Sequence, residues 1–180
     1  MRRKTWLSLF SFSLALLVTV AAAKAQTATQ VARQASRTGG YGYAFAAPGG
    51  RTTDDATLHL GGGGEYVFSG GGSVGAELGF LGPMEQFDVG FGVFSLNGGY
   101  HFKNASRSGK TVPFVTGGYT GIFRGGGGDS GFNFGVGVNH WFKDRVGLRL
   151  EFRDNVFRYS TSGGNDFVHY LNARVGVTFR

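Results

Sequence analysis

The sequence predicts an all-β protein, namely a single eight-stranded antiparallel up-and-down transmembrane β-barrel preceded by a cleaved signal peptide. Three observations lead to this prediction. From residue 40 onward, apolar residues alternate with small or polar ones, which gives each strand one apolar face. Glycine supplies 34 of the 180 residues, and turn-like clusters separate the alternating segments. Beyond residue 25 no apolar run reaches the ~20 residues of a membrane-spanning helix, so this chain can enter a membrane only as a closed barrel.

The start of the chain has the organisation of a secretory signal peptide. Basic residues at 2–4 precede an apolar stretch at 6–20, and a small-residue cleavage site follows at 23–25. An uncleaved membrane anchor is the alternative, but the apolar stretch is short for one. We therefore expect a signal peptide over 1–25, a polar N-terminal periplasmic arm over 26–39 and a barrel domain over 40–180.

The basic composition does not indicate a nucleic-acid-binding protein. The whole chain has a formal net charge of +7, but four basic residues and no acidic ones lie within the signal peptide. The mature chain would carry +3, with no cluster of Lys and Arg on any segment, so no nucleic acid is expected as a partner. The absence of cysteine excludes a disulfide scaffold, thiol catalysis and thiolate metal sites.

Alternation with a period of two divides the chain into eight expected strands. Two are irregular: 87–102 changes phase, which predicts a β-bulge near Val93, and 112–123 has no decisive apolar face. The glycine-rich segment 124–130 is expected to be a mobile surface loop. The expected strands are 40–47, 56–68, 73–81, 87–102, 111–123, 131–142, 146–159 and 166–180.

The non-apolar face of these strands is expected to line the interior of the barrel. A soluble barrel or sandwich would show the same alternation with its apolar face inward. Here the non-apolar face combines glycines with three acids and three arginines, whose charges can neutralise one another in a crowded interior. Most of the expected strands are also long for a soluble protein and suit a tilted crossing of lipid. The residues expected to form a structural ion-pair network in the lumen are Glu65, Glu77, Arg149, Glu151, Arg153 and Arg174.

Aromatic residues gather at the ends of the even-numbered expected strands. These ends fall on one side of an up-and-down barrel, and an even number of strands places them, with both termini, in the periplasm. A membrane interface selects such a ring, whereas β-propensity alone would scatter the aromatics along the strands. The expected periplasmic aromatic girdle consists of Tyr66, Phe68, Tyr100, Phe102, Trp141, Phe142 and Phe179.

The second half of the chain resembles the OmpA/OmpX-type small outer-membrane β-barrel family (outer membrane protein beta-barrel domain, porin-like). The resemblance rests on VPFVTGGYTGIF (112–123), FNFGVGVNHWFKDRVGLRLEFRD (132–154) and NARVGVTFR (172–180), and with the earlier hairpins it covers 40–180. It implies a location in the cell outer membrane, with outer-membrane lipid and lipopolysaccharide as partners, and we expect a monomer. The last strand also resembles the signal read by the barrel-assembly machinery, although Arg180 follows its terminal aromatic.

No catalytic, cofactor-binding or metal-binding residues are expected. The segment 70–75 matches G-x-G-x-x-G, but a strand rather than a helix is expected after it, so a dinucleotide site is not indicated. The histidines lack metal-ligand spacing because each falls on a different strand. A lipid A-modifying enzyme would need Ser and His oriented by an acid, of which His140 or His169 with Glu151 could supply only parts. The four histidines are His59, His101, His140 and His169.

These observations favour a non-enzymatic integral outer-membrane barrel that supports envelope integrity or displays binding loops. A narrow porin-like pore for ions or small solutes is the first alternative, because polar side chains line the expected lumen. An eight-stranded barrel is, however, only just wide enough for its own side chains. A lipid A-modifying barrel enzyme is the second alternative.

Overall fold

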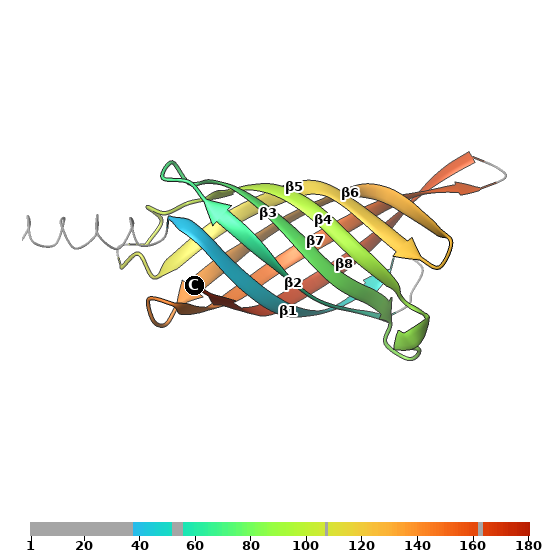
Figure 1. Cartoon of the computed structure of the whole chain (residues 1–180), viewed down its shortest axis with the longest axis horizontal. Helices are drawn as coiled ribbons and strands as arrows, with labels where there is room; N and C mark the ends of the chain where they lie inside the picture. The colour runs from blue at the N-terminus through green and yellow to red at the C-terminus, as the bar shows by residue number, and fades with distance from the viewer. Residues whose placement is uncertain (1–37, 52–55, 107, 162–163) are drawn as a thin grey trace, which may run out of the picture.

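The structure is a computed structural model, and it describes residues 38–51, 56–106, 108–161 and 164–180. It confirms the predicted all-β fold: eight antiparallel strands form a closed barrel, in which each strand pairs with the next and β8 pairs with β1 (Figure 1). Within the described residues no helix could cross a membrane. The strands are β1 (Gly39–Arg51), β2 (Ala56–Val67), β3 (Gly72–Pro83), β4 (Phe91–His101), β5 (Thr111–Arg124), β6 (Gly127–Trp141), β7 (Val146–Thr161) and β8 (Gly164–Phe179).

The predicted signal peptide and nearly all of the predicted periplasmic arm lie outside the described residues. Gly39, the last residue of that arm in the prediction, already belongs to β1 and pairs with Val67 of β2. The described chain therefore enters the barrel directly, and the first ladder starts at the rim where β8 also ends (Figure 1). We call this end the terminal rim and the opposite end the loop rim.

Alternation along the strands separates an apolar outer wall from a mixed interior. On β8, for example, Val175 and Val177 are exposed on the outer wall, whereas Arg174, which is adjacent to Val175, is buried. Side chains of successive residues point to opposite faces of a strand, so the pattern in the sequence becomes the two faces of the barrel. The wall is mostly apolar, which is the arrangement that a lipid environment favours and water does not.

The predicted β-bulge near Val93 is wrong. The ladders of β4 with β3 and β5 run without interruption from the pair Leu81–Phe91 to the pair His101–Phe114. The change of phase has another cause: Phe87–Val89 form a short 3-10 turn before β4, so these residues never join the sheet. Their apolar pattern belongs to a loop rather than to a distorted strand.

The predicted mobile loop at 124–130 is also wrong. β5 and β6 continue past the expected ends and pair until Arg124 meets Gly127. Only Gly125 and Gly126 remain as the turn, and Gly126 has φ of +102°, a value that L side chains rarely adopt. The glycines therefore make a tight hairpin turn and not a long loop.

Closure of the barrel can be tested by changing one residue of β8, whose Val177 pairs with Ala44 of β1 and Leu148 of β7. The refolded mature chain should resist SDS until it is heated, and it should run as a more compact species unboiled than boiled. Val177→Pro removes a backbone donor from a strand paired on both sides and should abolish this heat-dependent shift. Val177→Ala removes only wall surface and should keep it; a full shift in the proline variant would contradict closure through β8.

Candidate functional site: the barrel lumen

Six ionisable side chains form one continuous chain of ion pairs across the lumen. Its order alternates in sign: Glu65, Arg149, Glu151, Arg153, Glu77 and Arg174. The nitrogen–oxygen distances are 3.0 Å for Arg149 to Glu65 and to Glu151, 2.7 Å for Arg153 to Glu77 and 3.1 Å for Arg174 to Glu77. All six residues are buried. Equal numbers of acids and arginines leave the chain without net charge, which is what burial demands.

Neighbouring polar groups add hydrogen bonds at both ends of the chain. At the end nearer the terminal rim, Glu65 accepts a hydrogen bond from the Tyr41 hydroxyl (2.5 Å) and lies 2.7 Å from His101 Nε2. At the other end, Arg174 Nη2 lies 3.3 Å from His59 Nδ1. Tyr43 donates to Glu77 at 2.7 Å, so both tyrosines of β1 bind a carboxylate of the network. Two guanidinium nitrogens, Arg153 Nη2 and Arg174 Nε, are buried without a hydrogen-bond partner among the described residues. Loss of one charged member would leave its neighbour with an unpaired buried charge.

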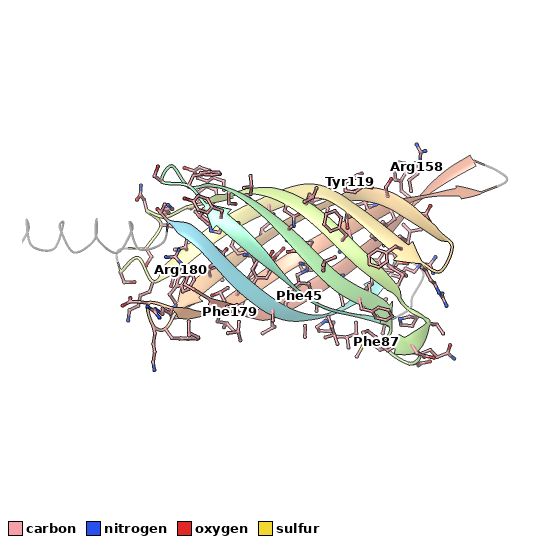
Figure 2. All side chains as sticks on the ribbon, viewed as in Figure 1. Phe45, Phe87, Tyr119, Arg158, Phe179 and Arg180 are labelled. Atoms are coloured by element: carbon pink, nitrogen blue, oxygen red, sulfur yellow. The ribbon has the colours of Figure 1, made fainter. Side chains whose placement is uncertain are left out.

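Aromatic rings cover the flat faces of two guanidinium groups. The Arg149 guanidinium carbon lies 4.0 Å from the ring centre of Phe114 and 4.6 Å from that of Tyr43. The guanidinium carbon of Arg174 lies 4.3 Å from the ring centre of Phe45. Figure 2 shows Phe45 between the two rims of the barrel. The rings thus make cation–π contacts with the faces of the guanidinium groups, whereas the carboxylates bind the nitrogens at their edges.

Glycines on the inner face create the room that the network occupies. A Cβ atom at Gly135 would lie 2.8 Å from Glu151 Oε1, and one at Gly63 would lie 3.0 Å from Glu77 Cγ and 2.9 Å from the Tyr43 hydroxyl. The distances of 2.8 and 2.9 Å are too short for real contacts, so an alanine at either position would displace a member of the network or its partner. The glycine content of the sequence thus has a packing role in addition to its role in turns.

Apolar residues close the lumen on both sides of the charged layer. One buried cluster follows β1 to the terminal rim and includes Tyr41, Val67 and Trp141. The second cluster lies toward the loop rim and consists of Leu81, Val93, Ile122, Phe157 and Tyr170, with Phe91 and Val168 packed against it. In the described part of the chain, these side chains occupy the interior between the charged layer and each rim.

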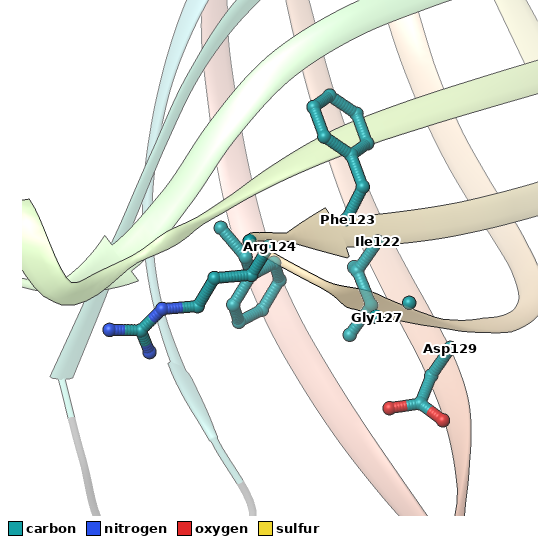
Figure 3. Close-up of a pocket in the computed structure, with 8 residues that line it drawn as sticks. Ile122, Phe123, Arg124, Gly127 and Asp129 are labelled. Carbon is teal, nitrogen blue, oxygen red and sulfur yellow. The ribbon is translucent and has the colours of Figure 1, made fainter.

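A hollow of about 510 Å³ opens at the loop rim beside the β5–β6 hairpin. Phe91 and Ile122 form its apolar floor, and Arg124 and Asp129 flank it (Figure 3). Figure 3 shows these two charged side chains extending away from each other, so they do not converge on one point of the hollow. Both residues of its floor belong to or pack against the second buried cluster, so the hollow lies directly over that cluster.

Six of the seven residues expected in the aromatic girdle lie on the outer wall near the terminal rim. Tyr66 and Phe68 pack edge to face with ring centres 5.2 Å apart, and Tyr100 and Phe102 do the same at 5.1 Å. All four are exposed, as are Phe142 and Phe179. Figure 2 shows Phe179 close to Arg180 at this end of the barrel.

The prediction that Trp141 belongs to the girdle is wrong. Its side chain is only 3% exposed and lies in the lumen, with its ring 5.8 Å from that of Tyr41 and under the Arg180 guanidinium. The reason is the alternation itself: Trp141 and Phe142 are adjacent, so they point to opposite sides of the wall. Phe142 takes the outer position and Trp141 closes the lumen.

Lys103 joins the turns of the terminal rim, outside the membrane-spanning strands. Its ammonium group donates to the Phe68 carbonyl at 2.8 Å, to the Ser69 carbonyl at 3.4 Å and to the Thr38 hydroxyl at 2.9 Å. Partial burial, together with the charge of Arg180 nearby, lowers the pKa of Lys103 below its ordinary value. These contacts fix the start of β1 against the turn between β2 and β3.

The parts suggested for a lipid-modifying site are not brought together. Glu151 lies in the lumen, whereas His140 and His169 stand on the outer wall, since each occupies an outward position of its strand. His140 Nδ1 lies 2.8 Å from the Thr111 hydroxyl, and His169 Nδ1 lies 2.7 Å from Asp154. In the described part of the chain no group of three His, Asp or Glu residues is arranged to hold a metal ion.

Comparison with known proteins gives the family. A family model described as "Outer membrane protein beta-barrel domain" matches residues 12–180. The chain belongs to this family. It is therefore an outer-membrane β-barrel protein. No match was found among the curated proteins.

Two solved structures of outer-membrane proteins share the architecture. The N-terminal β-barrel domain of OprF from Pseudomonas aeruginosa is 16% identical, with a TM-score of 0.54. Neisserial surface protein A is 15% identical, with a TM-score of 0.61. In both comparisons 79% of this chain and 97% of the other are covered. At these identities the likeness concerns the fold alone.

Sequence reasoning about this outer-membrane barrel missed the partners of its six charges. Tyr41, Tyr43 and His101 all complete hydrogen bonds of the network, and the spacing of Tyr41 and Tyr43 by two residues already placed them on one face. It also missed the pair of Asp154 and His169 on the outer wall. A signal for this pair existed, because Asp154 interrupts the series of apolar residues at the even positions of β7.

The network can be tested by a double-mutant cycle on Arg149 and Glu151. Arg149→Leu or Glu151→Leu alone leaves a buried charge without its partner, and each should destabilise the folded barrel by ~3–5 kcal/mol. The double variant removes a neutral pair and should cost clearly less than the sum of the two single changes. The free energy of unfolding would be measured by urea titration in lipid vesicles, with Leu150→Ala, on the outer wall between them, as the control. Additive losses would contradict the paired network.

The inward position of Trp141 can be tested by fluorescence, because the mature chain has no other tryptophan. Brominated acyl chains quench tryptophans that contact lipid, and Trp141 in refolded protein should be quenched little. The matched control exchanges two neighbours: Trp141→Phe with Phe142→Trp moves the same fluorophore to the outer wall and should be strongly quenched. Equal quenching of both proteins would overturn the inward assignment.

Proposed function

We propose that this chain is a non-enzymatic structural barrel of the outer membrane, with its terminal rim in the periplasm and a sealed lumen. Its role would be to support the integrity of the envelope or to present its loop rim at the cell surface. The observation that carries the proposal is the filled interior: a neutral chain of ion pairs with an apolar cluster on each side. A channel needs an interior that ions can enter and leave, whereas this one is occupied by the protein's own side chains.

The features of the two rims support the proposed orientation. The terminal rim carries the exposed aromatics of the girdle. An interfacial ring of aromatics is typical of outer-membrane barrels. The loop rim would then face outward with the hairpin around Gly126 and the 3-10 turn before β4.

The proposed partners are the envelope components that such a barrel would meet. Outer-membrane lipid and lipopolysaccharide would contact the apolar wall. The barrel-assembly machinery would read β8, where Val175, Val177 and Phe179 alternate on the outer side. β8 is also the strand that closes the barrel against β1, so its recognition would couple assembly to closure.

Conductance across planar lipid bilayers separates this proposal from the narrow pore. The refolded wild-type barrel should give no steady current. Glu77→Ala with Arg174→Ala removes a neutral pair of long side chains from the lumen and should allow intermittent currents, while Leu78→Ala on the outer wall should behave like the wild type. A steady ohmic current through the wild-type protein would contradict the sealed lumen and favour the pore. A changed mass of lipid A on expression would contradict the non-enzymatic role.

A further inference from the structure

The two rims of the barrel differ in the charge of their side chains. Among the side chains that the structure describes, the loop rim is balanced, whereas the terminal rim carries an excess of basic groups beside the exposed aromatics of the girdle. The charged residues of the loop rim are Arg51, Arg124 and Arg158 with Glu85, Asp88 and Asp129. Those of the terminal rim are Lys103, Lys110, Lys143, Arg145 and Arg180 with Asp144.

Two cations of the terminal rim are used by the protein itself. The ammonium group of Lys103 donates to three oxygens of the neighbouring turn and of the chain before β1. The guanidinium carbon of Arg180 lies 5.0 Å from the ring centre of Trp141, and its Nε and Nη2 atoms are buried. These two side chains therefore hold the rim together and are not open to a molecule from outside.

The other three cations form one exposed patch, which we call the basic corner. It consists of Lys110, Lys143 and Arg145, all of which are exposed. Among the described residues, no group lies within hydrogen-bond or ion-pair distance of their side-chain nitrogens. Asp144 lies between two of them in the chain and is exposed too, but it makes no ion pair in that part of the structure. The corner therefore presents more positive than negative charge, and the described protein does not neutralise it.

Backbone hydrogen bonds bring the members of the basic corner together. The nitrogen of Trp141 donates to the Lys110 carbonyl at 2.9 Å, so the residue before β5 lies beside the end of β6. The nitrogens of Phe142 and Lys143 both donate to the Val146 carbonyl at 3.1 Å, which makes a tight turn between β6 and β7. Neighbouring strands are ~4.8 Å apart, and Lys and Arg have long stems, so the three charged groups can reach one anion.

The outer wall directly next to the basic corner is apolar at the surface. Phe142, Val146 and Phe179 are exposed there, and Val146 pairs with Phe179 in the ladder of β7 and β8. A small polar step follows on the same wall, where His140 Nδ1 lies 2.8 Å from the Thr111 hydroxyl. The His140 ring also packs edge to face against Phe142, with ring centres 5.2 Å apart. Cations, polar groups and apolar surface thus adjoin one another at this end of β6.

A phospholipid with a net negative headgroup fits this combination. The exposed aromatics mark the membrane interface, so the cations that follow them lie at the level of the lipid phosphates. Lys and Arg near a membrane surface attract anionic lipids. A zwitterionic phospholipid brings a cation of its own to the basic corner, and a soluble anion has no hydrocarbon to cover the exposed phenylalanines.

We propose that Lys110, Lys143 and Arg145 form a binding site for the phosphate of an anionic phospholipid, whose acyl chains lie along Phe142 and Phe179. Phosphatidylglycerol has the required chemistry. The inference rests on the proposed function only for assigning this lipid to the periplasmic leaflet, and it is independent of whether the lumen conducts.

Quenching of a single tryptophan measures which lipid covers the wall beside the basic corner. The reporter is the refolded mature chain with Trp141→Phe and Phe142→Trp, whose only tryptophan lies on this wall. Vesicles of phosphatidylcholine contain a minority of phosphatidylglycerol, and bromine is placed on the acyl chains of either the phosphatidylglycerol or an equal amount of phosphatidylcholine. At low salt we expect about fivefold stronger quenching by the phosphatidylglycerol, because unneutralised cations attract it to the corner.

Further substitutions in the reporter assign that preference to the basic corner. Lys143→Gln with Arg145→Gln leaves one cation opposite Asp144 and should bring the quenching ratio close to one. Arg124→Gln with Arg158→Gln is the matched control, because it removes the same charge from exposed positions of the loop rim and should leave the ratio unchanged. The heat-dependent shift in SDS verifies that each variant is folded.

Three outcomes would overturn the proposal. The first is equal quenching by the two lipids in the reporter, since the cations would then be left for a soluble partner. The second is a preference that survives in Lys143→Gln with Arg145→Gln. The third is the same loss in the loop-rim control, which would assign the preference to the total charge of the protein. Failure of the proposed function gives a different signature, namely a steady current through the wild-type barrel with an unchanged quenching ratio.

Discussion

The chain of six alternating charges is the constraint to which the rest of the barrel conforms. Its members come from β2, β3, β7 and β8, and each one occupies an inward position. A slip of one residue in the register of any of these strands would turn its charges toward lipid, because successive side chains point to opposite faces. The apolar wall resists the same slip, but it does not resist a slip of two residues, which keeps every side chain on its own face. A slip of two residues would separate the partners of the ion pairs, so the buried charges specify the register that the wall leaves open.

The same constraint explains the composition of the interior. Three arginines and three glutamates need space, and inward glycines such as Gly63 and Gly135 provide it where a Cβ would collide with the network. Aromatic residues then cover the guanidinium faces and close the barrel above and below the charges. Glycine, long charged side chains and aromatics are thus parts of one packing solution, and an interior occupied by the protein's own side chains is its consequence.

Most of the fold could be predicted because strands and turns follow from local sequence patterns. The errors arose where the position of a residue depends on how the strands pair in the closed barrel. Alternation and turn residues were enough for eight strands, and charge balance was enough to select the six lumen residues. The order of the ion pairs depends on the ladders and cannot be read from spacing. The segment 87–89 keeps an apolar rhythm outside the sheet, so its phase suggested a bulge that does not exist. Trp141 was assigned to the outer girdle because it is aromatic. It is two residues from Asn139, however, so both side chains point to the same, inward side of the strand.

Asp154 shows how the same chemistry has a different meaning on the two sides of the wall. Inside, every carboxylate of the network binds at least two groups of the protein, so the charge is balanced without help from outside. Outside, Asp154 contacts one imidazole and keeps an acceptor that the described chain does not satisfy. The balance of charge that accounts for the six lumen residues therefore does not extend to Asp154, whose place on the outer side of β7 follows from the strand alternation alone.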